Sequence, residues 1–157
     1  MSKAVVPVSG GIDSSVILAY ARDRHTQVFP ITFNYGQRHI KELDCAKKQS
    51  GDNYKEIDLT FFRDIAHTSS LTNNNIDVAK TKDVLGDAQT VNYVPFRNQM
   101  LLSIACAYAE AVGADTVYHG AALIDSQAGY WDGSIEFLNS INNLIALNRK
   151  NKINIQA

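Results

Sequence analysis

Residues 4–21 read AVVPVSGGIDSSVILAYA, and this stretch decides the fold. An apolar run at residues 4–8 stops at two adjacent glycines, and a second apolar run at residues 16–21 follows almost at once. This order is typical of a strand, a glycine turn and a helix. Glycine tolerates positive φ, and a helix start offers unpaired N–H groups and the positive end of its dipole. The stretch predicts a phosphate or pyrophosphate site; a turn that merely joins strand to helix is the alternative.

Spacing excludes two better-known phosphate loops. A Walker A loop needs a lysine and a hydroxyl after its last glycine, whereas Gly11 is followed by Ile12 and Asp13. A Rossmann fingerprint needs a third glycine where this chain has Ser14. The remaining string resembles the SGGxDS loop (PP-loop) of the ATP pyrophosphatases, which split ATP between its α and β phosphates. The resemblance implies that the protein adenylates a substrate.

Composition indicates one globular domain, residues 1–157. The chain is 45% hydrophobic and 20% charged, which is enough to bury roughly two thirds of its extended surface. A net charge of -1 gives no electrostatic case for binding nucleic acid or an anionic membrane, although a small polyanion could be held by a few placed groups. The amino end shows neither a secretory signal nor a membrane span, so we expect a cytoplasmic protein.

The two cysteines, Cys45 and Cys106, are far apart in the chain and each lies in a predicted helix. They form neither a disulfide framework nor a CxxC metal pair, and we expect both to pack in the core.

Short β-rich runs alternate with longer helical patterns, which predicts an α/β fold with a doubly wound, mainly parallel sheet and helices on both faces. Pro7 and Pro30 fall inside predicted strands, where each lacks a ladder donor unless its nitrogen faces away from the neighbouring strand. The expected strands are residues 3–8, 28–34, 54–59 and 116–119, with a fifth opening at 152–157. The expected helices are residues 13–24, one between Gly36 and Gly51, one capped by Asn98 and Gly113, and one capped by Ser134.

Helical spacing also predicts which side chains face the sheet. The stripes are Val16, Ile17, Ala19, Tyr20 and Ala21 in the first helix; Ile40, Leu43, Ala46 and Lys47 in the second; and Ile135, Leu138, Ile141, Leu144 and Ile145 in the last. Periodicity fades over residues 61–92, so we expect a binding loop, a lid or a partly disordered connection there, and its polarity favours mobility.

Ligands of doubly wound sheets bind outside the carboxyl ends of the strands. Arg38 and His39 leave their strand on the same rim as SGGIDSS, so Arg38 could reach phosphate and His39 could assist proton transfer. The alternative is an ordinary solvated helix start paired with Glu42. Arg97 precedes a helix and predicts a second anion site, with an interhelical salt bridge as its alternative.

Four blocks carry a more specific resemblance: SGGIDSS at residues 9–15, YGQRHIKEL at 35–43, VPFRN at 94–98 and GYWDGSIEF at 129–137. Together they resemble the 7-cyano-7-deazaguanine synthase family, over essentially the whole chain. The resemblance implies the Rossmann-like fold of adenine nucleotide alpha hydrolases. It also implies that ATP activates 7-carboxy-7-deazaguanine, that ammonia gives an amide, and that a second adenylation leads to the nitrile in queuosine or deazaguanine biosynthesis.

The resemblance also implies roles for individual residues. Asp13 lies near magnesium; Asp13, Arg38, His39 and Arg97 act in catalysis; and the remaining assignments concern ligand binding. ATP is held by Val8, Ser9, Gly10, Gly11, Ile12, Asp13, Ser14, Ser15, Val16, Ile17 and Leu18, and the acceptor or ammonia by Tyr35, Gln37, Asn98, Asp125, Tyr130 and Asp132. The expected partners are these small molecules, without direct nucleic acid or membrane, in a possible homodimer.

Two departures from the family qualify this interpretation. The family carries proline, cysteine and arginine around the block that here reads YWDGS at residues 130–134. Its carboxy-terminal section, in which four cysteines bind a structural zinc, has no counterpart here, so we expect a truncated form or a fragment, without zinc ligands. The alternatives are a non-catalytic nucleotide-binding module, or another ATP pyrophosphatase such as a tRNA thiolase or an amide-forming synthetase; a thiolase would need paired cysteines and a basic surface, which this sequence lacks.

Overall fold

The computed structural model describes residues 2–79, 90–121, 130–148 and 150–157. Their strands form one sheet in the order β3-β2-β1-β4-β5, and every neighbouring pair is parallel. This arrangement confirms the predicted α/β class. The strands are β1 (Lys3–Pro7), β2 (Gln27–Asn34), β3 (Lys55–Asp58), β4 (Thr116–Tyr118) and β5 (Asn154–Gln156), each close to its predicted range.

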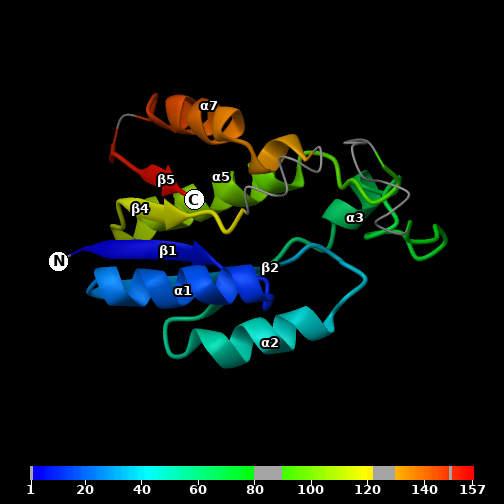
Figure 1. Cartoon of the computed structure of the whole chain (residues 1–157), viewed down its shortest axis with the longest axis horizontal. Helices are drawn as coiled ribbons and strands as arrows, with labels where there is room; N and C mark the ends of the chain where they lie inside the picture. The colour runs from blue at the N-terminus through cyan, green and yellow to red at the C-terminus, as the bar shows by residue number, and fades with distance from the viewer. Residues whose placement is uncertain (1, 80–89, 122–129, 149) are drawn as a thin grey trace.

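Helices cover both faces of the sheet, as predicted (Figure 1). The helices are α1 (Ile12–Arg24), α2 (Lys41–Ser50), α3 (Phe62–Ile65), α5 (Arg97–Val112) and α7 (Ile135–Ile145), with a short 3-10 helix η1 (Trp131–Gly133) before α7. Side chains of β1 alternate between the faces: Ala4 and Val6 pack under α1 and α2, whereas Val5 packs under α5 and α7.

Both prolines fit the sheet because their nitrogens face positions without a ladder partner. Val8 donates to the carbonyl of Ile31, so Pro7, one residue earlier, faces β4, whose pairing with β1 ends at Val5. Pro30 faces β3, where pairing begins one residue later, at Ile31. The sequence left this question open, and the staggered ends of the strands resolve it.

The predicted stripe of α1 is wrong in part. The buried face consists of Ser14, Leu18 and Ala21, at i, i+4 and i+7, whereas Val16 and Tyr20 are 61% and 43% exposed. Residues 16–21 form a continuous apolar run, so the sequence alone does not show which face of the helix is buried. Packing against β1 decides which residues are buried. The stripes of α2 and α7 are corrected similarly: Leu43, Ala46 and Ile141 are buried, Leu138 and Ile145 are partly buried, and Ile40, Lys47, Ile135 and Leu144 are exposed.

The start of α5 also differs from the prediction. Asn98 is the second residue of the helix, and the N-cap is Phe96, in the left-handed region at φ 52°. Gly113 does cap the carboxyl end, at φ 71°, with its N–H bonded to the carbonyls of Ala109 and Glu110. Ser134 caps α7 as expected, because its hydroxyl accepts from the backbone N–H of Phe137 at 3.0 Å.

The connection after β3 is more ordered than its polarity predicted. It begins with α3, and in the described part the hydroxyl-bearing residues Ser69, Ser70 and Thr72 are buried. The Ser70 hydroxyl donates to the Asn92 side chain at 2.7 Å, so the two ends of the segment are joined. Polar residues order a loop when their hydrogen bonds are made internally. Residues 80–89 of the predicted loop lie outside the described residues.

The two cysteines behave differently from each other. Cys106 is buried in α5, as predicted, and burial raises the pKa of its thiol to about 11. Cys45 is exposed on α2, so the expectation that it packs in the core is wrong. Within the described residues, no helix is long and apolar enough to cross a membrane.

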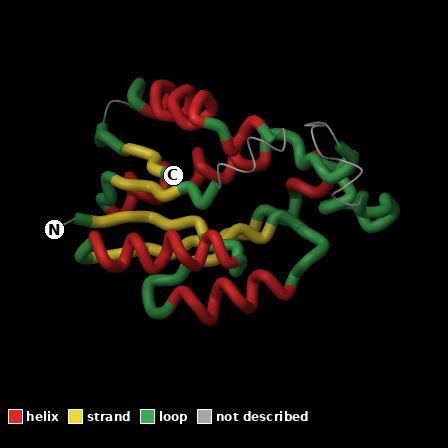
Figure 2. Tube along the Cα trace, in the orientation of Figure 1, coloured by secondary structure: helices red, strands yellow, loops and turns green. Residues whose placement is uncertain are grey.

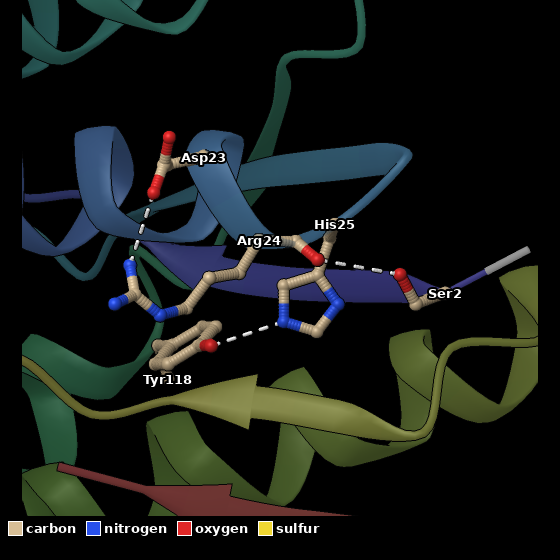
Figure 3. A network of polar contacts seen from close by, with 5 residues as sticks. All are labelled: Ser2, Asp23, Arg24, His25 and Tyr118. Carbon is tan, nitrogen blue, oxygen red and sulfur yellow. Dashed lines mark hydrogen bonds and ion pairs between the residues drawn. The ribbon is translucent and has the colours of Figure 1, made fainter.

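The carboxyl end of α1 is attached to β4 through His25 and Tyr118. Figure 3 shows the His25 ring beside Tyr118, and its Nε2 lies 3.0 Å from the phenol oxygen. Burial raises the pKa of the Tyr118 phenol, so the phenol keeps its proton near neutral pH. The guanidinium of Arg24 stacks on Tyr20, whose ring meets Tyr118 edge to face. This attachment fixes one end of α1 while its other end borders the candidate site.

Candidate active site

A cleft of about 540 Å³ lies at the carboxyl ends of β1, β2 and β4. The sheet order places β1 between β2 and β4, and helices on opposite faces follow β1 and precede β4, so the cleft sits at the switch point of a doubly wound sheet. Figure 2 shows the loops that leave the strands gathered on this side, away from the N-terminus. The site is therefore where such folds bind their ligands.

The SGGIDSS turn is shaped by its contact with α2. Gly10 has φ 88°, and a Cβ there would clash with the carbonyl oxygen of Glu42 and come within 3.0 Å of the Ala46 nitrogen. Gly11, by contrast, has φ −81°, close to values that any residue adopts. The role of both glycines in ligand binding stays a prediction, and the structure shows that Gly10 also lets the loop pack on α2.

The hydroxyls of this loop bond to one another. The Ser14 hydroxyl donates to the Gly11 carbonyl at 3.0 Å and accepts from the Ser9 backbone N–H at 3.3 Å, and Gly11 N–H donates to the Ser9 hydroxyl at 3.3 Å. α1 has no side-chain cap on its first turn. Ser9 and Ser14 line the cleft. The hydroxyl-bearing residues on the two sides of the turn, Ser9 before it and Ser14 in the first turn of α1, therefore line the same space, which suits an anion.

A side chain from α2 reaches the outer side of the loop. The Ser15 hydroxyl lies 2.7 Å from Oε1 of Gln49 and 2.7 Å from the Gly11 carbonyl. Nε2 of Gln49 is 3.5 Å from the Gly10 carbonyl. Gln49 thus bonds to both arms of the turn, and sequence reasoning did not single it out because nothing in a helical glutamine marks such a contact.

The structure brings about half of the predicted site residues together. Those that line the cleft are Val8, Ser9, Ser14, Tyr35, Gln37, Arg97, Asn98, Tyr130 and Asp132. The other described candidates are not among its lining residues: Gly10, Gly11, Ile12, Asp13, Ser15, Val16, Ile17, Leu18, Arg38 and His39. Leu18 is in the core, and Ile12 is 81% exposed. Asp125 lies outside the described residues.

The YGQRH block is used mainly to shape the rim. The side chain of Gln37 is buried; it accepts from Tyr35 N–H at 3.0 Å and donates to the Phe33 carbonyl at 3.2 Å. The Arg38 guanidinium donates to the carbonyls of Asn74 and Ile76 and so ties the segment after α3 to the end of β2. In this structure Arg38 is a link between loops and does not face the cleft.

Charge in the described cleft is sparse and mixed. Arg97, held by a bond from its Nε to Asn98 Oδ1 at 3.2 Å, is the lining arginine, and Glu42 and Asp132 are the lining carboxylates. Magnesium in nucleotide sites binds through one or two carboxylates together with substrate phosphates. Glu42 and Asp132 match that number of carboxylates, and within the described residues no group of three acidic, histidine or cysteine side chains gathers.

Sequence reasoning missed five polar lining residues: Thr32, Glu42, Asn92, Tyr93 and His119. His119 directly follows β4, and its Nε2 lies 3.0 Å from the backbone oxygen of Asp132. Its position at a strand's carboxyl end, beside Gly120, was the available signal. His39, which the sequence favoured for proton transfer, is exposed.

Comparison with protein-family models shows the family to which this chain belongs. A model described as "Queuosine biosynthesis protein QueC" matches residues 3–157. The chain belongs to the QueC family. Curated relatives include 7-cyano-7-deazaguanine synthases from Picrophilus torridus, 42% identical over 94% of this chain, and from Rickettsia felis, 41% identical over 99%. The chain spans 62% of the Picrophilus relative and 71% of the Rickettsia relative.

Solved structures support the fold of this QueC-family chain. A U34-tRNA thiolase from Methanococcus maripaludis superposes with a TM-score of 0.53 at 19% identity, covering 98% of this chain and 50% of that one. A 4-thiouridine synthetase in complex with RNA and ATP gives a TM-score of 0.53 at 21% identity, over 98% of this chain and 36% of the other. At this identity the likeness concerns architecture only.

Proposed function

We propose that this chain carries the adenylating site of a 7-cyano-7-deazaguanine synthase. The observation that carries the proposal is the cleft itself: Ser9 and Ser14 of the SGGIDSS loop, Arg97 of VPFRN, and Tyr130 and Asp132 of GYWDG line one space. Three blocks that are far apart in sequence therefore meet where an ATP and an acceptor would react. QueC membership supports the choice of acceptor.

The proposed chemistry activates one carbon twice. A carboxylate oxygen of 7-carboxy-7-deazaguanine attacks the α-phosphorus of ATP, and pyrophosphate leaves toward the loop. Ammonia displaces AMP from the acyl adenylate and gives the amide. The amide oxygen attacks the α-phosphorus of a second ATP with release of pyrophosphate, and the O-adenylated amide then loses AMP and both N–H protons to give the nitrile. Each adenylation turns an oxygen that would leave as oxide or hydroxide into part of a stable phosphate ester.

Each residue of the cleft has a proposed role that follows from its position. The start of α1, with Ser9 and Ser14, receives pyrophosphate through N–H and hydroxyl donors. Arg97 stabilises charge that develops on the reacting phosphate. Tyr130 offers a flat face and Asp132 an acceptor for the N–H donors of a deazapurine. Magnesium, when bound with ATP, would reduce the charge on the phosphates; Glu42, which lines the cleft, and Asp13, in the first turn of α1, are the candidate carboxylates.

The test is pyrophosphate release by this 157-residue chain given ATP, 7-carboxy-7-deazaguanine and ammonium. Release that requires the carboxylate, with the nitrile detected by mass spectrometry, is the expected result. Release that ignores the carboxylate would contradict the acceptor, and ATP binding without turnover would favour a binding module. Cytoplasmic location and a homodimer remain part of this proposal.

A further inference from the structure

The segment Tyr130–Gly133 forms one wall of the cleft and is held in place at several points. Its carboxyl end is fixed, because Ser134 caps α7 through the N–H of Phe137 at 3.0 Å. Within the segment, Gly133 N–H bonds to the Tyr130 carbonyl at 3.1 Å, which makes a compact turn. Neither bond attaches the turn to the sheet.

His119 supplies an attachment to the sheet. Its Nε2 lies 3.0 Å from the backbone oxygen of Asp132, so this nitrogen carries the hydrogen and donates it. The ring also packs against Phe137 of α7, with centroids 6.2 Å apart. His119 itself is rigidly held, because its backbone N–H donates to the Gln156 carbonyl of β5 at 2.6 Å.

We propose that His119 is a positioning residue that holds Tyr130–Gly133 as the acceptor-side wall of the cleft, through the bond from Nε2 to the Asp132 carbonyl. The bond holds the backbone at Asp132, two residues after Tyr130, and the side chains of both residues line the cleft with His119. Recognition by a flat face and a carboxylate depends on their placement to within a fraction of an ångström. The recognised chemistry is that of an aminopyrimidinone edge, and in this respect the inference rests on the proposed function.

The experiment has two readouts, and only one needs the reaction. Trp131 is the single tryptophan of the chain and lies in the wall itself, so its fluorescence anisotropy reports the segment's freedom directly. The second readout is the KM for 7-carboxy-7-deazaguanine in pyrophosphate release. The variants are His119→Phe, which removes the donor, and His119→Gln, whose amide nitrogen can occupy the place of Nε2. His67→Phe is the matched control, because the His67 ring likewise bonds to a backbone carbonyl, that of Asp64, outside the cleft.

We expect His119→Phe to lower Trp131 anisotropy and raise the acceptor KM about threefold to tenfold, as loss of one neutral hydrogen bond implies, with the KM for ATP unchanged. His119→Gln should restore both values, and His67→Phe should leave them at the wild-type level. Equal effects of Phe and Gln, or unchanged anisotropy in His119→Phe, would overturn the proposal. If the wild type shows no carboxylate-dependent turnover, the proposed function fails, while the anisotropy series still decides whether His119 holds the wall.

Discussion

The Ser15 hydroxyl lies 2.7 Å from Oε1 of Gln49, so a side chain of α2 holds the outer arm of the SGGIDSS loop. We therefore expect Gln49→Leu to raise the KM for ATP about fivefold, the equivalent of one net hydrogen bond, and to leave the acceptor KM unchanged. Lys48→Ala, on the exposed face of the same helix, is the control. The double variant Gln49→Leu/Ser15→Ala tests whether Gln49 acts through Ser15. If it does, Gln49→Leu should not raise the KM for ATP further when Ser15 is already alanine.

Gly10 is required by packing as well as by conformation. Gly10→Ala should destabilise the chain by about 2 kcal/mol or more, since it adds a clash with the α2 backbone to the left-handed strain. Gly113→Ala is the matched control: it has a similar positive φ, but the nearest atom to an added Cβ is 4.0 Å away, so about 1 kcal/mol is expected. Urea unfolding measures both, and equal losses would show that the α2 contact is unimportant.

Substitution of Arg97 and substitution of Arg38 should have different effects. Arg97→Gln removes the lining cation and should slow pyrophosphate release about 100-fold or more with the fold intact. Arg38→Gln removes the bonds to the carbonyls of residues 74 and 76 and should instead increase protease sensitivity of that segment. A 100-fold loss of activity in Arg38→Gln, without any change in proteolysis, would return Arg38 to the phosphate site.

Phe96 occupies a left-handed conformation that phenylalanine adopts reluctantly, just before Arg97. Its side chain is 70% exposed, so substitution changes mainly the backbone preference. Phe96→Asn should retain or increase the free energy of unfolding, whereas the β-branched Phe96→Val should lower it by about 1 kcal/mol relative to Asn. Thermal unfolding compares the pair; equal stability would indicate that Phe96 stores no strain.

Burial of Cys106 gives a stability that depends on pH. Because the pKa of its thiol is raised to about 11, the neutral thiol favours the folded state, and this contribution is present below the ordinary thiol pKa. It is lost as the pH rises from the ordinary value of 9.0 through about 11, where the unfolded thiol ionises and the folded one does not. Urea midpoints measured across this range should fall less in Cys106→Ala. Thiol titration at pH 8 should label Cys45 and leave Cys106 protected until urea is added.

The sequence by itself determined the class of the fold and the place of the site. The alternation of apolar strands with helical runs is local information, and parallel strands necessarily bring the ends of residues 4–8 and 28–34 to one edge. The SGGIDSS and YGQRHIKEL blocks were therefore predicted to share one rim, and the four blocks together resembled the family to which the chain belongs.

Only the tertiary structure decided which side chains of those blocks face the cleft. Successive residues of a helix point about 100° apart, and packing on the sheet chose the face of α1 that carries Ser14, not Val16. Arg38 and Arg97 carry the same charge, and both were predicted to bind an anion. Long-range hydrogen bonds tie Arg38 to the loop after α3, whereas Arg97 lines the cleft. Contacts such as Gln49 with Ser15 and His119 with Asp132 join residues that no local pattern links, because they arise from packing between elements and not from periodicity within them.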